Sequence, residues 1–292
     1  TSIILSLAGI FQAFHAINTY VLYQSVLIPL LSSIGIWFSD VSTVDELWGL
    51  IFFVSVLVLI VMILQLSSML LNRRNVFSSS FKPFDIKLIK FINKKATNIG
   101  ADQIVTSLNK YGYIFIIGLF LAPIDITFFT VAQRFSMIIS FFLLVINAIS
   151  GPIYANLIEQ KDHKRLIAIF YRNVKLCLIG ALASFVFILI FSGLFSDISN
   201  VPKHIFLYLF LLLAIGEIIN VATGSSVLVL QMSDQSKLVL ISSLAFTVIG
   251  LCVATIASQQ NIYLVACCVA VTVAGHNLNC FRLFRRFSLK EI

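Results

Sequence analysis

The feature that most constrains the fold is a series of long apolar runs, each separated from the next by a short polar segment. A membrane-spanning helix needs about 20 mainly apolar residues to cross a hydrocarbon layer of ~30 Å. The chain has eight clear runs of this kind, and 60% of its 292 residues are hydrophobic, more than in soluble globular proteins. The predicted crossings are residues 17–38, 47–71, 97–121, 126–150, 166–192, 203–230, 237–257 and 261–284.

The same runs argue against the other fold that can span a membrane. A closed β-barrel has strands of about 10 residues in which polar and apolar residues alternate, whereas these runs are longer and uniformly apolar. We therefore predict an all-α, polytopic transmembrane helix bundle. Residues 1–11 resemble the end of a ninth helix and the chain does not begin with Met, so we expect further helices upstream.

The basic residues are distributed very unevenly among the loops. Lys and Arg concentrate in the cytoplasmic loops of membrane proteins. Of the 20 basic residues, all but Lys110, Arg134 and Lys203 lie in four segments that are separated from one another by two crossings. These segments are 72–95, 159–175, Lys237 and the tail from residue 282. We therefore expect them and the C-terminus to be cytoplasmic, which explains the net charge of +8 without nucleic acid.

The longest polar interval, near residues 72–96, is the best candidate for a boundary between two bundles. Its residues divide between two faces of a helix, with Phe84, Leu88, Phe91 and Ile92 on one and Lys87, Lys90 and Lys94 on the other. This pattern is typical of a helix that lies in the membrane interface. A connector anchored to the bilayer surface is the simpler interpretation, and capture of an anionic lipid headgroup is the alternative.

A stripe of polar residues marks the crossing predicted at 97–121. Asn98, Asp102, Thr106, Asn109 and Tyr113 recur every three or four residues, so they share one helical face. Polar groups that face hydrocarbon cost roughly several kcal/mol, and the stripe must therefore face protein or a water-filled cavity. The alternative to a cavity is that hydrogen bonding between helices alone explains Thr106 and Asn109.

Three ionisable residues lie deep within predicted crossings. At 1.5 Å per residue, Arg134 lies roughly 13 Å, Lys110 roughly 17 Å and Glu217 roughly 20 Å from the periplasmic ends of their helices. Such groups usually line a bundle interior or an aqueous path. A structural ion pair between Glu217 and one of the cations is one interpretation. Because two cations face one acid, an anionic ligand is the other, and Gln133, next to Arg134, is included in this candidate site.

The sequence contains no motif for covalent chemistry. A nucleophile motif, phosphate loop, zinc signature and nucleotide-binding domain are all missing from it, so we expect no enzyme and no cofactor. We interpret the five Cys residues as small packing residues. His276 is predicted to be a hydrogen-bonded packing residue in preference to a proton carrier, and Asp125 is expected to cap a helix N-terminus.

Residues 109–166 resemble the seventh and eighth helices of polysaccharide flippases of the multidrug/oligosaccharidyl-lipid/polysaccharide superfamily, in the O-antigen (Wzx-like) group. The shared elements are an aromatic-x-x-A-x-R segment from Phe129 to Arg134, the apolar run up to Pro152, and the polar loop "EQKDHKRL" before a Leu-rich helix. Asn109 and Lys110 stand where members of that group often have an Asp-Arg pair, which retains the cation.

The resemblance implies a MATE-like architecture of two six-helix lobes facing a central cavity. Residues 1–71 would be the remnant of the first lobe, 72–96 the basic cytoplasmic connector, and 97–292 the second lobe. The family moves undecaprenyl-pyrophosphate-linked oligosaccharide repeat units from the cytoplasmic to the periplasmic leaflet of the bacterial inner membrane, by alternating access, for O-antigen or capsule synthesis. Membrane lipids and other polysaccharide-assembly proteins are the implied partners.

The resemblance also implies roles for the candidate residues. Arg134 and Lys110 would attract the pyrophosphate or acidic sugars, and the polar stripe would hydrogen-bond to sugar hydroxyls. Glu217 would couple transport to H⁺ or Na⁺. Two other functions are weighed against this one. A multidrug cation antiporter of the same superfamily would be expected to have a more acidic cavity, and a membrane glycan polymerase or ligase would be expected to have a large periplasmic segment.

Overall fold

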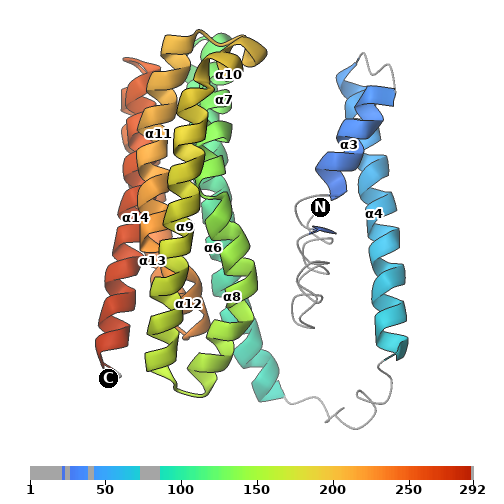
Figure 1. Ribbon diagram of the computed structural model, residues 1–292, viewed down its shortest axis with the longest axis vertical. Helices are drawn as coiled ribbons and strands as arrows, with labels where there is room; N and C mark the ends of the chain where they lie inside the picture. The colour runs from blue at the N-terminus through green and yellow to red at the C-terminus, as the bar shows by residue number, and fades with distance from the viewer. Residues whose placement is uncertain (1–21, 24–26, 39–42, 73–85, 291–292) are drawn as a thin grey trace. The chain divides into compact units, whose positions relative to one another are not determined.

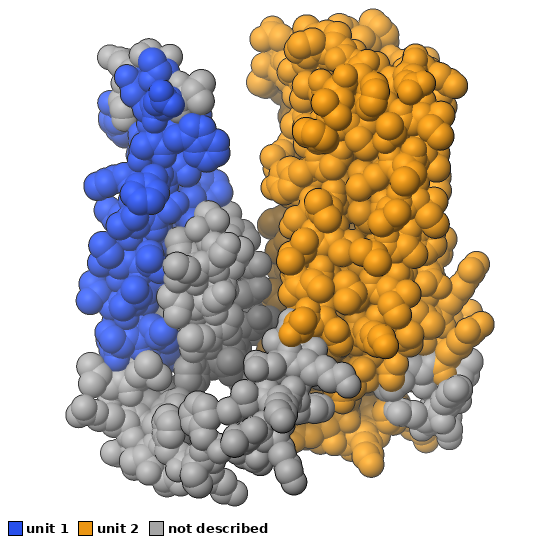
Figure 2. Space-filling view, turned by 180° about the vertical axis from the view of Figure 1, so that it is seen from behind, with its two compact units in different colours: residues 1–86 blue, residues 87–292 orange. Residues whose placement is uncertain are grey.

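The computed structural model describes residues 22–23, 27–38, 43–72 and 86–290. Apart from one turn at residues 22–23, these residues form α-helices and their connections. The chain divides into two compact units, residues 1–86 and residues 87–292, which Figure 2 colours separately. The division lies inside the predicted connector. The partial helix predicted at 1–11 and most of the polar interval before Ile86 lie outside the described residues.

Unit 1 is described as an antiparallel pair of helices, α3 (Leu27–Phe38) and α4 (Val44–Asn72) (Figure 1). Thr43 and Glu46 begin α4 with a reciprocal capping box, in which each side chain accepts a hydrogen bond from the other residue's backbone N–H at 3.3 Å. The core of the pair is small and centres on Val58 and Met62. The predicted crossing at 47–71 is confirmed within about three residues.

Unit 2 contains the other helices of the described residues. They are α6 (Ile86–Phe120), α7 (Pro123–Ile139), α8 (Phe141–Glu159), α9 (His163–Ile190), α10 (Ser192–Ser199), α11 (Lys203–Thr223), α12 (Ser226–Met232), α13 (Ser236–Ala257) and α14 (Ile262–Lys290). Helix α11 is central to the bundle, because it packs extensively against α14, α7 and α9. Gly216 permits the closest approach, since a Cβ there would lie 2.9 Å from the Cα of Ala270 in α14.

Six helices in the described part of the chain are long and apolar enough to cross a membrane. They are α4, α8, α9, α11, α13 and α14. This confirms the prediction of an all-α, polytopic bundle. Helix α7 has only 17 residues. Helix α6 is long enough, with 35 residues, but it includes the predicted polar stripe and does not meet the criterion of composition.

Two predicted helix boundaries were wrong. The crossing predicted from residue 97 belongs to a helix that already begins at Ile86, because residues 86–97 contain neither proline nor glycine. The crossing predicted at 126–150 is instead two successive helices, α7 and α8, which meet at Ser140 and continue to Glu159. Pro152 lies inside α8, in keeping with the tolerance of membrane helices for proline.

A third predicted helix, 203–230, is broken at Gly224. This residue has φ +60° and ψ −151°, a conformation that is accessible almost only to glycine. A Cβ at this position would lie 2.4 Å from the Cγ2 of Val174 in α9. The chain therefore leaves α11 at Thr223, and the short helix α12 begins at Ser226.

Candidate functional site

The polar stripe of α6 faces the interior of unit 2 at only some of its positions. Asp102 and Tyr113 are buried, with 4% and 0% of their surface exposed. Asn98 and Asn109 are partly buried, whereas Thr106 is exposed. The stripe is therefore divided between residues that contact other helices and residues that the bundle leaves open.

Asp102 is held by donors from two other helices. The Ser243 hydroxyl of α13 donates to Oδ1 of Asp102, and Nε2 of Gln231 in α12 donates to Oδ2 at 3.0 Å. Both carboxylate oxygens are thus satisfied inside the bundle, as burial of a charged group requires. Asn98, one turn earlier on α6, donates to Ser236 of α13 at 3.5 Å.

A second group of polar side chains adjoins Asp102. Nδ1 of His276 in α14 lies 3.2 Å from the Ser242 hydroxyl oxygen, which also accepts a hydrogen bond from Asn279 at 2.9 Å. Ser242 is adjacent in sequence to Ser243, the donor to Asp102. The prediction that His276 is hydrogen-bonded within the bundle is confirmed. We call Asp102, Gln231, Ser242, Ser243, His276 and Asn279 the buried polar cluster.

Tyr113 also makes a contact between helices. Its hydroxyl lies 2.7 Å from the Thr272 hydroxyl of α14. The hydrogen bond passes directly over Gly250 of α13, where a Cβ would lie 2.1 Å from Thr272 Oγ1 and 2.3 Å from the Tyr113 hydroxyl oxygen. Hydrogen bonding between helices is thus observed at Tyr113 and Asp102, whereas the sequence had offered it as the explanation of Thr106 and Asn109.

Lys110 of α6 and Glu217 of α11 are both partly buried. Asn220 donates to Oε2 of the partly buried Glu217 at 3.2 Å, and the Ser140 side chain lies beside the same carboxyl. No direct ion pair joins Lys110 to this carboxyl in the described residues. Next to Lys110, the amide oxygen of Asn109 is buried with no hydrogen-bond partner among the described residues.

Arg134 and Gln133 lie on different faces of α7. Gln133 is buried, with 7% of its surface exposed. Arg134 is exposed, on the same face of α7 as Ile138, which is 44% exposed. In the part of the chain that the structure describes, Arg134 forms no ion pair, so the pairing of Arg134 with Glu217 that we considered is not observed.

Sequence reasoning missed a second buried network, at the break between α11 and α12. Asn173 of α9 donates to the hydroxyl oxygens of Ser150 and Tyr154 in α8, at 2.7 and 2.9 Å. Ser225, next to Gly224, donates to Asn147 at 2.5 Å. The signal that could have found this network is the helical spacing of Asn173, which places it on the same face of α9 as the apolar residues Leu166, Phe170 and Cys177.

Two minor predictions have clear outcomes. Asp125 lies at the third position of α7, where its carboxylate accepts the backbone N–H of Ala122 at 3.2 Å, so its capping role is confirmed. Cys177 and Cys280 are buried, as packing residues should be. Cys252 is exposed on α13, and the predicted packing role was wrong for this residue because it lies on the outward face of its helix.

These helices and their internal polar contacts define a polytopic membrane bundle with a MATE-like fold. Three solved structures share this fold. The structure of MATE in the bent conformation has a TM-score of 0.75 and 14% sequence identity, and the match covers 94% of this chain and 65% of that one. For MATE in the straight conformation the TM-score is 0.74, the identity 15% and the coverages 98% and 66%, and for MATE in complex with MaL6 the TM-score is 0.75, the identity 16% and the coverages 98% and 69%.

This chain thus spans about two thirds of the length of those proteins. No family model matches the sequence. No curated protein matches it either. At sequence identities of 14–16%, the similarity to these structures establishes the fold alone.

Proposed function

We propose that this chain is part of a transporter of the multidrug/oligosaccharidyl-lipid/polysaccharide superfamily that moves undecaprenyl-pyrophosphate-linked oligosaccharides across the bacterial inner membrane. The MATE-like fold supports the class of transporter. The observation that supports an anionic substrate is the contrast between acids and cations in unit 2. Asp102 and Glu217 accept hydrogen bonds from internal donors, whereas Arg134 is exposed and, among the described residues, forms no ion pair.

The position of Arg134 strengthens this contrast. It lies 11 residues after the start of α7 at Pro123, which corresponds to a depth of roughly 16 Å. A guanidinium at this depth is costly against hydrocarbon, so its face of α7 should border an aqueous path or a bound ligand. A guanidinium also matches phosphate through two parallel hydrogen bonds, which an ammonium cannot form.

The other candidate residues would serve the same substrate in different ways. Lys110 would add positive charge, and Thr106, Asn98, Gln133 and the unsatisfied amide of Asn109 would hydrogen-bond to sugar hydroxyls. Asp102 and Tyr113 are bound to other helices of unit 2, so we assign them to holding α6 in place. Glu217 would be the site at which H⁺ or Na⁺ is coupled to transport.

Complementation tests the proposal. The full-length gene would be expressed in a strain lacking its surface-polysaccharide flippase, as wild type, Arg134→Ala and Arg134→Lys at matched membrane abundance. We expect wild type to restore surface polysaccharide and both variants to lose most of it. Lys203→Ala, which removes an exposed cation at the start of α11, is the matched control and should behave as wild type. Full activity of Arg134→Ala would exclude Arg134 from the substrate site.

A multidrug cation antiporter of the same superfamily is the second candidate. The observation that favours it is the partly buried carboxyl of Glu217, which lies deep in α11 and could attract a cationic drug. An efflux assay with a fluorescent cationic dye separates the two functions. Efflux that disappears in Glu217→Gln, together with no restoration of polysaccharide by wild type, would support the antiporter instead.

A further inference from the structure

The outward face of α9 changes character along its length. Its buried residues recur every three or four positions, at Leu166, Phe170, Asn173, Cys177 and Ala181, and define one face. The opposite face is exposed and apolar from Leu176 to Ile190. Its large side chains are Leu176, Ile179, Leu182, Val186, Phe187 and Ile190, with 51–71% of their surface exposed. Before Leu176 the same face is basic.

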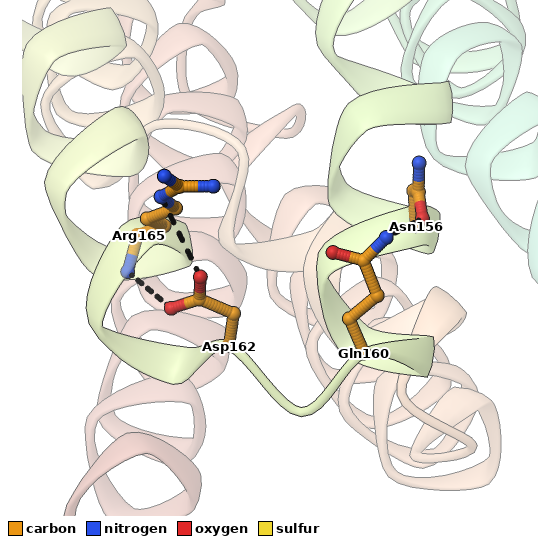
Figure 3. Close-up of polar contacts among 4 residues, drawn as sticks. All are labelled: Asn156, Gln160, Asp162 and Arg165. Atoms are coloured by element: carbon orange, nitrogen blue, oxygen red, sulfur yellow. Dashed lines mark hydrogen bonds and ion pairs between the residues drawn. The ribbon is translucent and has the colours of Figure 1, made fainter.

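The four exposed cations at the start of α9 are Lys164, Arg165, Arg172 and Lys175. Arg165 is already engaged, because its backbone N–H and its guanidinium both contact Asp162, at 3.1 and 3.6 Å (Figure 3). Arg172 and Lys175 are one helical turn apart on the exposed face, and neither forms an ion pair in the part of the chain that the structure describes. Tyr171, beside them, is 44% exposed.

The apolar part of this face is too short to cross a bilayer. Leu176–Ile190 measures roughly 21 Å at 1.5 Å per residue, against a hydrocarbon layer of ~30 Å. Arg172 and Lys175 therefore lie within or at the edge of the hydrocarbon layer, where long basic side chains extend towards the headgroups. An exposed Tyr beside them is typical of that interface.

Helix α14 carries a cation at the same level. Phe170 of α9 packs on Phe284 of α14, with 4.3 Å between ring centroids. The two helices run in opposite directions (Figure 1). Arg172 and the exposed Arg282 therefore each lie two residues from this ring contact, both in the direction of the apolar part of the α9 face. The positive charge at this end of unit 2 thus comes from two neighbouring helices.

We infer that the outer face of α9 binds an anionic phospholipid of the surrounding bilayer, with its phosphate held by Arg172 and Lys175 and its acyl chains lying along Leu176 and Ile179. Charge complementarity identifies the headgroup, and the continuous apolar face identifies the lipid tails. The inference requires that unit 2 spans a membrane with this face of α9 against the lipid. It does not depend on the substrate that is transported.

The test uses the purified full-length protein in vesicles of equal parts dioleoyl phosphatidylglycerol and dioleoyl phosphatidylcholine. Lipid that remains bound after detergent extraction is quantified by mass spectrometry. Wild type should retain phosphatidylglycerol in preference to phosphatidylcholine. Arg172→Gln with Lys175→Gln should reduce that preference at least about fivefold, since each basic residue near an anionic surface strengthens binding by roughly this factor. The swap of Arg172→Lys with Lys175→Arg should retain most of it.

The control removes the same charge from the turn before α9 and from the first turn of that helix, as Lys161→Gln with Lys164→Gln. Wild-type preference in this control, together with loss in the first pair, assigns the lipid to Arg172 and Lys175. Equal losses in both pairs, or no preference in wild type, would overturn the site. Displacement of the lipid by millimolar inorganic phosphate would show an anion site without lipid specificity and would also overturn the inference.

Discussion

At the scale of single residues, the structure separates charged and polar groups that serve the bundle from those that are free for a ligand. Asp102 and Tyr113 belong to the first kind, because each is buried and bound to another helix. Arg134 belongs to the second, because it is exposed and unpaired among the described residues. The sequence placed all three in one candidate site, since depth and helical face do not reveal the partners.

Removal of a donor to Asp102 should destabilise unit 2. Ser243→Ala leaves a buried carboxylate oxygen without its hydroxyl donor, and an unsatisfied buried polar group costs roughly 1–3 kcal/mol. We expect a lower temperature of thermal unfolding in detergent. The double variant with Asp102→Asn should lose less free energy of unfolding than the sum of the losses in the two single variants, because the two residues contact each other.

The matched control for this prediction is Ser107→Ala on α6. Ser107 is exposed and its hydroxyl bonds only to the backbone oxygen of Gln103, at 2.9 Å. The change in stability should stay within about 0.5 kcal/mol, as for most surface substitutions. If the two serine variants unfolded at the same temperature, the bond between Ser243 and Asp102 would have no role in stability.

At the scale of the helices, glycine positions decide where a helix breaks and how closely two helices pack. The break at Gly224 separates α11 from α12, and the small surface of Gly250 admits the hydrogen bond between Tyr113 and Thr272. In the sequence both residues are glycines inside apolar runs. Only the backbone dihedrals and the neighbouring helices distinguish a break from a close contact.

Gly224→Ala should be strongly destabilising. Alanine at φ +60° and ψ −151° is strained, and its Cβ would collide with Val174, so we expect a loss of more than about 2 kcal/mol. Gly193→Ala is the control, because the nearest atom to a Cβ there is 3.8 Å away. Thermal unfolding measures the stability of both variants.

Adding Val174→Ala to Gly224→Ala separates the two causes. It removes the collision but leaves the backbone strain, so stability should be recovered only in part. Full recovery would assign the effect to the collision alone. A stable Gly224→Ala protein would mean that α11 and α12 form one continuous helix, as the hydrophobic pattern had predicted.

At the scale of the whole molecule, the unequal distribution of basic residues matches the arrangement of unit 2. The turn between α8 and α9 and the C-terminal end of α14 lie at one end of the unit, and α10 lies at the other (Figure 1). The first end carries Lys164, Arg165 and Arg282, all exposed. From the positive-inside rule we propose that this end faces the cytoplasm.

Labelling of introduced cysteines tests this orientation. In a protein that otherwise lacks cysteine, Lys164→Cys should react with a membrane-impermeant thiol reagent only when the cytoplasmic face is accessible. Lys203→Cys, at the start of α11 near α10, should react from the periplasmic side in intact spheroplasts. Labelling of both positions from the same side would contradict the assigned topology.

The sequence by itself determined that this protein is an all-helical, multi-pass membrane bundle, because runs of about 20 apolar residues leave the chain no other way to satisfy its backbone in hydrocarbon. It also located the deep polar residues. The tertiary structure decided where the helices break and which polar groups face one another. Those outcomes depend on contacts between distant residues, such as Asp102 with Ser243 and Gly224 with Val174, which no local pattern encodes.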